Sequence, residues 1–195
     1  SPILKQLIKE TLNRSNDKEI DVTKEVAEKL KKSRSGIFQN EIDYRFLLND
    51  FTPLKTNNRS AVDILGFNGE KFNFVEYKLF DEKKPQSYHH WSALWHLRCD
   101  IEKLEHASGF KSNHDIDFYF VFAVRHANTS LNKEQLKTAI EHFYSTDTRK
   151  PAIKAFNQYT VLKTFESSEI DICKKWDMQL LNRKGDSFLV GRLKK

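Results

Sequence analysis

Two carboxylates and an ammonium lie at short spacings in an apolar stretch of the sequence, at Asp63, Glu76 and Lys78. Carboxylate oxygens are the ligands that hard cations such as Mg²⁺ prefer, and a cation held in this way keeps positions open for water and phosphate oxygens. Such a cation stabilises charge on a phosphate and lowers the pKa of a bound water, while a nearby ammonium can orient that water or neutralise developing charge. Together these residue types indicate phosphodiester hydrolysis.

The residues around this set predict a β-hairpin. Residues 61–67 and 72–80 are rich in Val, Ile and aromatic residues, and Asn68-Gly69 between them is a strong signal for a two-residue turn. Because side chains alternate along a strand, Glu76 and Lys78 share one face.

A two-residue turn would also set the register of this hairpin. It would pair Asp63 with Phe74 and place Asp63 diagonally across from Glu76 on the same face. The opposite face would then be an apolar row that must be buried. This row consists of Val62, Ile64, Val75, Tyr77 and Leu79.

An acidic residue followed two positions later by Lys is common in this sequence, so its context decides its meaning. The triplet begins at Glu76, Asp81 and Glu82, and only the first lies within an apolar strand next to a strand with an aspartate on the same face. The alternative is an ordinary ion pair between Glu76 and Lys78 at a sheet edge, which contributes less than about 1 kcal/mol, with Asp63 as a turn or cap residue.

Val62-Asp63, a turn and then Glu76-Tyr77-Lys78 resemble the signature of the PD-(D/E)XK nuclease superfamily, which has the restriction-endonuclease-like fold. The resemblance covers roughly residues 38–125. It implies an α/β fold with a central mixed β-sheet flanked by helices. The chain departs from the family at Val62, where proline is frequent.

The resemblance also implies roles for individual residues. Asp63 and Glu76 would hold Mg²⁺ or Mn²⁺, Lys78 would assist the attacking water, and the carbonyl of Tyr77 would complete the coordination. A helix before the hairpin often supplies a further acidic ligand in that family, a role that Glu41 matches. Some branches have a glutamine and a tyrosine in the helix after the hairpin; this chain has Gln86 and His90 there, which would approach the site only from its periphery.

Apolar periodicity predicts the elements that position this set. Two amphipathic helices open the chain, and a third, with Phe38, Ile42, Phe46 and Leu48 on its apolar face, would carry Glu41. A helix is expected over 86–106, and residues 117–124 are typical of a strand buried on both faces in the middle of the sheet.

The remaining residues predict a further helix and strands within one domain. A helix is expected over 131–144 and a strand over 159–165, while 168–193 is compatible with a helix plus a strand or with a second hairpin. No repeat or flexible linker divides the sequence. We therefore expect a single nuclease domain, made of an N-terminal helical region (1–36), a catalytic core (37–130) and a C-terminal helix with strands (131–195).

The charge balance suits a polyanionic partner. Lys and Arg number 33 against 27 Asp and Glu, a formal charge of +6. Basic residues that flank the proposed centre could bind phosphates, although a solvated charged surface is the alternative for each group. The proposed phosphate-binding residues are Lys55, Arg59, Lys83 and Lys84, and a further group precedes them at Lys31, Lys32 and Arg34.

The cysteine content and the motifs missing from the sequence narrow the class of protein and its cellular compartment. The two cysteines, Cys99 and Cys173, form no disulfide framework or thiolate zinc motif, and no membrane-spanning or secretory pattern is present. A cytoplasmic, intracellular protein is expected, without a membrane partner. Phosphate-binding loops, dinucleotide fingerprints and nucleophile motifs are also missing from the sequence.

The sequence thus predicts a metal-dependent nuclease that acts on nucleic acid, with DNA preferred as the substrate. Two alternatives stay open: a catalytically inactive nucleic-acid-binding module of the same fold, and an RNA-directed endonuclease. A homodimer that cuts both strands is compatible with this interpretation, but the sequence does not decide it.

Overall fold

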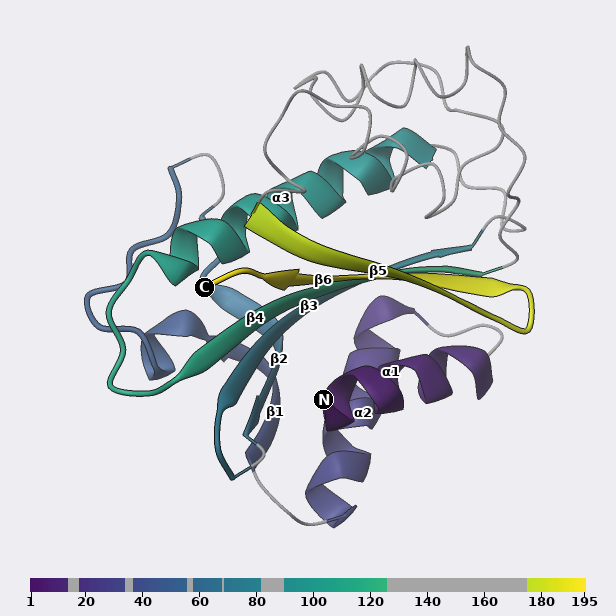
Figure 1. Cartoon of the computed structure of the whole chain (residues 1–195), viewed down its shortest axis with the longest axis horizontal. Helices are drawn as coiled ribbons and strands as arrows, with labels where there is room; N and C mark the ends of the chain where they lie inside the picture. The colour runs from purple at the N-terminus through teal and green to yellow at the C-terminus, as the bar shows by residue number, and fades with distance from the viewer. Residues whose placement is uncertain (14–17, 34–36, 56–57, 68, 82–89, 126–174) are drawn as a thin grey trace. The chain divides into compact units, whose positions relative to one another are not determined.

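The computed structural model describes residues 1–13, 18–33, 37–55, 58–67, 69–81, 90–125 and 175–195. Three helices pack against a mixed sheet of six strands in the order β1-β2-β3-β4-β6-β5 (Figure 1). The helices are α1 (Pro2–Asn13), α2 (Glu19–Ser33) and α3 (His90–Ser108), with a short 3-10 helix η1 (Tyr44–Phe46). The strands are β1 (Ile37–Asp43), β2 (Ala61–Phe67), β3 (Phe72–Asp81), β4 (Ile116–Arg125), β5 (Trp176–Arg183) and β6 (Asp186–Leu193).

The chain forms two compact units. The first comprises Ser1–Tyr77 and Asp100–Val121, and the second comprises Lys78–Cys99 and Phe122–Lys195. Asp63 and Glu76 belong to the first unit, whereas Lys78 belongs to the second. The predicted single domain stays a prediction.

The two N-terminal helices are confirmed, and each buries one apolar face. Ile3 and Leu7 of α1 and Val22 and Val26 of α2 are fully buried. The hydroxyls of Thr11 and Tyr77 lie 2.7 Å apart, which ties α1 to the face of β3 that carries Tyr77. Within the first unit, α1 and α2 therefore cover this face, and the C-terminal half of α3 lies across the opposite one (Figure 1).

The predicted third helix, the one expected to carry Glu41, is wrong. Residues 37–43 instead form β1, which pairs antiparallel with β2. The spacing of Phe38 and Ile42 fits a helix, but pairing with β2 gives the backbone groups of this segment their hydrogen-bond partners. Glu41 has a φ of 51°, and Phe46 is 57% exposed, so neither fits the expected amphipathic helix.

The β2–β3 hairpin is confirmed, but its predicted register is wrong by two residues. Phe67 pairs with Phe72 and Leu65 with Phe74, so the loop spans 68–71 rather than two residues. The rings of Phe67 and Phe72 lie 4.6 Å apart, and the Phe72 amide donates to the Asp115 carbonyl at 3.0 Å. These contacts favour the longer loop, and a shift of two residues leaves every side chain on its predicted face.

Burial of the apolar row on β2 and β3 is also confirmed for most of its members. Val62, Ile64, Val75 and Tyr77 are at most 1% exposed, while Leu79 is half-buried. The adjacent strand β4 lies inside the sheet, as predicted for residues 117–124.

Helix α3 (His90–Ser108) confirms the helix expected over 86–106 from His90 onward and ends two residues later than predicted, while residues 86–89 lie outside the described residues. The C-terminal tail forms a hairpin, the second of the two alternatives that the sequence left open. Strands β5 and β6 pair from Trp176 and Leu193 to Arg183 and Asp186. Lys184 and Gly185 at the turn have positive φ angles of 49° and 84°, as tight hairpins require.

The helix and strand predicted for 131–144 and 159–165 lie outside the described residues. None of the helices that the structure describes is long and apolar enough to cross a membrane.

Candidate active site

Glu76 is a buried carboxylate in the interior of the sheet. It is 2% exposed on the third of six strands, so an ion pair at a sheet edge does not describe it. Its Oε1 accepts hydrogen bonds from the Tyr44 hydroxyl at 2.8 Å and from the Lys103 ammonium at 2.7 Å. Ring contacts of about 5 Å with Phe51 and Phe74 hold Tyr44 in place. The charge of Glu76 is therefore balanced by a residue of α3.

Lys103 lies among oxygen atoms. Besides Glu76, its Nζ donates to the Ala61 carbonyl at 3.1 Å and lies 3.9 Å from Oδ1 of Asp100. Its side chain is only 5% exposed. Burial would lower the pKa of Lys103, but the Glu76 and Asp100 carboxylates outweigh it and raise that pKa above its ordinary value.

Asp63 provides a second carboxylate beside Glu76. The β2–β3 pairing ends at Ile64 and Val75, one position short of Asp63 and Glu76. Oδ2 of Asp63 accepts a hydrogen bond from the Tyr77 amide at 2.7 Å, which fixes its orientation. Burial, and then the charge of Asp63, raise the pKa of Glu76 well above its ordinary value. The bond from the Tyr77 amide brings the Asp63 carboxylate to the residue next to Glu76.

A hollow of about 490 Å³ opens at Asp63. The β1–β2 register places Glu41 opposite Asp63, although Glu41 lies on a strand and not on the predicted helix. Glu41 and Asp63 both line the hollow, and so does Lys103. The remaining lining residues are Asn58, Arg59, Ser60, Ala61 and Val62. The hollow therefore brings carboxylates and cations to one place.

The other two residues predicted for the catalytic centre are Lys78 and Tyr77, both on β3. Lys78 follows Glu76 by two residues on β3, and its side chain is half-buried. Tyr77 uses its amide to hold Asp63 and its hydroxyl to contact Thr11. The predicted role of its carbonyl stays a prediction.

The predicted phosphate-binding residues fall into two groups. Arg59 and Lys55 are exposed, and Arg59 lines the hollow. Lys31 and Lys32 are exposed in the last turn of α2. Arg34, Lys83 and Lys84 lie outside the described residues, as do Gln86 and the side chain of His90, which were predicted at the periphery of the site and not as phosphate-binding residues.

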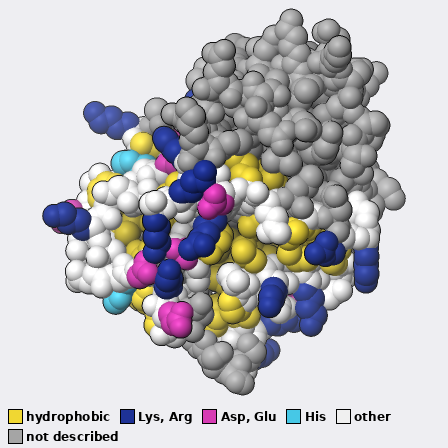
Figure 2. Space-filling view, in the orientation of Figure 1, with side chains coloured by type: hydrophobic (Ala, Val, Ile, Leu, Met, Phe, Trp, Pro, Cys, Tyr) yellow, Lys and Arg dark blue, Asp and Glu magenta, His cyan; other side chains and the backbone are white. Residues whose placement is uncertain are grey.

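On the face shown in Figure 2, Lys and Arg side chains gather in a band with Asp and Glu side chains among them. Hydrophobic side chains are visible beside this band. The positive charge on this face is therefore mixed with negative charge.

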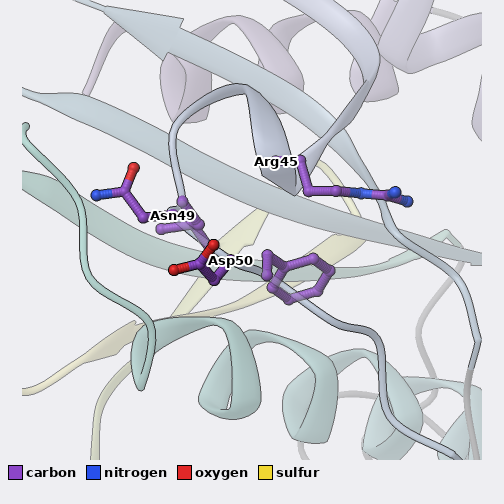
Figure 3. Close-up of a pocket in the computed structure, with 5 residues that line it drawn as sticks. Arg45, Asn49 and Asp50 are labelled. Atoms are coloured by element: carbon purple, nitrogen blue, oxygen red, sulfur yellow. The ribbon is translucent and has the colours of Figure 1, made fainter.

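A second hollow lies beside η1, and one short segment lines it. Its lining residues are Arg45, Leu48, Asn49, Asp50 and Phe51. Arg45 and Asn49 extend in opposite directions (Figure 3), and Arg45 already pairs with Asp43 at 3.0 Å. This hollow gathers no convergent set of side chains, so the hollow at Asp63 is the stronger candidate.

Sequence reasoning missed Tyr44, Asp100 and Lys103. A signal existed for the two on α3, because both fall on its buried stripe between Leu97 and Ala107, and both are at most 7% exposed. Charged residues on an apolar helix stripe are rarely buried without a partner. The partner itself, on β3, was not visible in that pattern.

The oxygens around Lys103 are of the kind that bind cations. In the described part of the chain, no three His, Cys, Asp or Glu side chains are gathered as a metal-binding group. The ammonium nevertheless occupies a cation position formed by oxygens of Glu76, Asp100 and Ala61. Mg²⁺ and Mn²⁺ take the same kind of ligands. Among the described residues these oxygens therefore hold the Lys103 ammonium and do not by themselves form a divalent-cation site.

No family model, curated protein or solved structure matches this chain.

Proposed function

We propose that this chain is a Mg²⁺- or Mn²⁺-dependent nuclease of the PD-(D/E)XK superfamily that hydrolyses DNA. One observation carries the proposal: the Asp63 carboxylate on β2 accepts a hydrogen bond at 2.7 Å from the amide of Tyr77, the residue after Glu76 on β3, beside a hollow lined by Asp63, Arg59 and Lys103. Paired carboxylates that hold a divalent cation, with further cations nearby, are one arrangement that stabilises the charge developed in phosphodiester hydrolysis.

Each residue has a distinct part in this proposal. Asp63 and Glu76 would hold Mg²⁺ or Mn²⁺, with Glu41 and the Tyr77 carbonyl as further oxygen donors, and the ion would supply charge neutralisation and an acidified water. Lys78 would orient the attacking water. Arg59 and Lys55 would bind phosphates of the nucleic acid, since Arg59 lines the hollow and Lys55 is exposed nearby in sequence.

One observation favours a second candidate, an inactive nucleic-acid-binding module of the same fold. Lys103 already neutralises Glu76 at 2.7 Å, so this buried charge has a partner without a metal. Such a module would bind nucleic acid and cut none. An RNA-directed endonuclease would differ from our proposal in substrate alone.

The test is cleavage of supercoiled plasmid, linear duplex, single-stranded DNA and RNA with Mg²⁺, Mn²⁺ or EDTA. The variants Asp63→Asn, Glu76→Gln and Lys78→Met should each lose about 10²–10⁴-fold in metal-dependent cleavage of DNA, as expected for groups that take part in proton transfer or ion binding. Asp63→Asn keeps an oxygen to accept the bond from the Tyr77 amide, so its folding should persist. Glu76→Gln leaves the buried Lys103 ammonium without its carboxylate and should melt at a lower temperature, so its fold is checked by circular dichroism.

Two exposed residues provide matched controls. Lys111→Met and Asp177→Asn remove one charge each from residues that are exposed and outside the site. Both should cut DNA as the unaltered chain does. Full activity in Asp63→Asn or Lys78→Met would discard the assignment, and binding without cleavage under every metal condition would favour the inactive module.

A further inference from the structure

Helix α1 contacts β3 through a hydrogen bond between two buried hydroxyl groups. Thr11 of α1 and Tyr77 of β3 are at most 1% exposed, and their hydroxyl oxygens lie 2.7 Å apart. The Thr11 hydroxyl donates its one hydrogen to the Leu7 carbonyl at 2.7 Å, so the hydrogen between Thr11 and Tyr77 comes from Tyr77. The direction of the Tyr77 side chain is therefore set by α1.

The backbone of Tyr77 in turn holds the Asp63 carboxylate. The pairing of β2 with β3 ends at Ile64 and Val75, and beyond it the Tyr77 amide donates to Oδ2 of Asp63 at 2.7 Å. Asp63 is half-buried and lines the hollow of about 490 Å³. The direction of this carboxylate in the hollow therefore depends on where the Tyr77 backbone lies.

The two hydroxyls lie in an otherwise apolar layer. Tyr77 shares its face of the β2–β3 hairpin with Val62, Ile64 and Val75, none of which is more than 1% exposed. Apolar side chains could pack α1 against this face without any hydroxyl group. Dispersion contacts have little preference for direction, whereas a satisfied buried hydrogen bond favours a single arrangement. The Thr11–Tyr77 bond thus fixes an orientation that packing would leave loose.

We propose that Thr11 is a positioning residue for Asp63, acting through Tyr77. Thr11 fixes the Tyr77 side chain, and the Tyr77 amide fixes the carboxylate that lines the hollow. Helix α1 is itself anchored, because Glu10 pairs with Lys29 of α2 at 2.7 Å. The inference rests on the proposed function for the reaction that Asp63 serves, and it extends that site to a helix on the other side of the sheet.

The first test measures the bond between Tyr77 and Asp63 directly, in the full chain without metal or nucleic acid. Nuclear magnetic resonance detects this bond as a scalar coupling between the Tyr77 amide nitrogen and the Asp63 carboxyl carbon. In Thr11→Val and in Tyr77→Phe the coupling should fall. The Tyr77 amide should also exchange its hydrogen about tenfold faster, relative to the paired amides of β2 and β3.

A buried threonine of α2 provides the matched control. Thr23 is 3% exposed, and its hydroxyl donates to the Ile20 carbonyl of its own helix at 3.1 Å. Thr23→Val therefore removes a similar hydroxyl without a contact to Tyr77, and the coupling should stay as in the unaltered chain. An unchanged coupling in Thr11→Val, or an equal loss in Thr23→Val, would overturn the proposal.

A second variant keeps the proposal testable if Thr11→Val does not fold. Tyr77→Phe removes the other hydroxyl of the pair and leaves Thr11 bonded to the Leu7 carbonyl, so the fold should tolerate it better. A coupling in Tyr77→Phe equal to that of the unaltered chain would then overturn the proposal.

DNA cleavage gives a readout that a merely structural threonine would not move. In Thr11→Val we expect kcat to fall by about 10–10²-fold with KM little changed, because a misdirected group loses transition-state stabilisation without loss of binding. Thr11→Ser keeps the hydroxyl and should recover most of kcat. A lower melting temperature with kcat intact would contradict the proposal. Absence of cleavage by the unaltered chain would refute the nuclease, and the scalar coupling would then decide by itself whether Thr11 positions Asp63.

Discussion

The pKa of Glu76 is subject to opposing influences from its surroundings. Burial and the neighbouring Asp63 raise its pKa, whereas the Lys103 ammonium lowers it, and the net pKa lies well above the ordinary value. The same contact raises the pKa of Lys103. A carboxylate in this position gains more from a cation than an exposed one does, because little water is available to solvate it.

The pKa of Asp43, the residue before η1, is lowered instead of raised. Burial alone would raise its pKa, but hydrogen bonds from the Arg45 amide at 2.8 Å and the Ser60 hydroxyl at 2.9 Å outweigh it and lower the pKa below 3.8. Because the folded pKa is the lower one, the ionised carboxylate stabilises the fold above the unfolded pKa. That stabilisation is lost as the pH falls through the folded pKa.

The substitution Asp43→Ala should therefore destabilise the fold at neutral pH and cost less in acid. We expect a loss of about 0.5–2 kcal/mol at pH 7, typical of a helix cap, and nearer the lower limit because solvent screens a carboxylate of which 42% is exposed. Urea denaturation at pH 7 and at acid pH below the folded pKa measures the difference. The exposed Asp177→Ala is the control, and a loss at Asp43 that is the same at both pH values would contradict this account.

At the scale of elements, β3 carries Glu76 on one face and Tyr77 on the other, because side chains alternate along a strand. Glu76 points to Lys103 of α3, and its neighbour Tyr77 contacts Thr11 of α1 on the other face. The polar site is thus built against α3, and the helical layer of α1 and α2 supports it from behind. The position of α1 depends on β2 as well.

Gly66 on β2 allows α1 to approach the sheet closely. A Cβ atom at this position would collide with the side chain of Ile3 and lie 3.2 Å from Cδ1 of Phe38. Gly66→Ala should therefore destabilise the fold by about 1–3 kcal/mol, as overpacking of a core does. Thermal or urea unfolding measures this loss.

The companion substitution Ile3→Val tests the cause of that loss, because it removes the terminal methyl group that a Cβ at Gly66 would meet first. In the Gly66→Ala background it should recover part of the lost stability, although alone it costs about 0.5–1.5 kcal/mol. Additive losses in the double variant would show that the contact with α1 is not the reason.

At the scale of the whole molecule, the formal charge of +6 predicts that the nucleic-acid binding we propose weakens with salt. On the visible face of the molecule basic side chains are mixed with acidic ones (Figure 2), so we expect only a few phosphate contacts. Arg59 at the hollow and the exposed Lys55 are two of those we propose.

The double variant Lys55→Ala/Arg59→Ala should bind duplex DNA more weakly, and the dependence of its log affinity on log salt should be shallower by about 2, one for each lost phosphate contact. Fluorescence anisotropy over a series of salt concentrations, in EDTA so that nothing is cut, measures both quantities. Lys111→Met/Lys194→Met removes two exposed lysines elsewhere and controls for net charge. Equal slopes in both double variants would show that the effect is not local to the hollow.

The sequence by itself determined the local features of this protein. The faces of the β2–β3 hairpin followed from alternation, which needs no knowledge of partners, and they survived a register error of two residues. The helical periodicity of α1 and α2 and the continuous apolar run of β4 were equally local signals. They placed Asp63 and Glu76 together because both residues belong to one hairpin.

Only the tertiary structure decided what surrounds those two carboxylates. Residues 37–43 have a spacing that fits a helix, and pairing with β2 made them a strand, which brought Glu41 opposite Asp63. Lys103 reaches Glu76 from a helix 27 positions further along the chain (103 − 76), at 2.7 Å. Such contacts depend on how elements pack, and periodicity within an element carries no record of them.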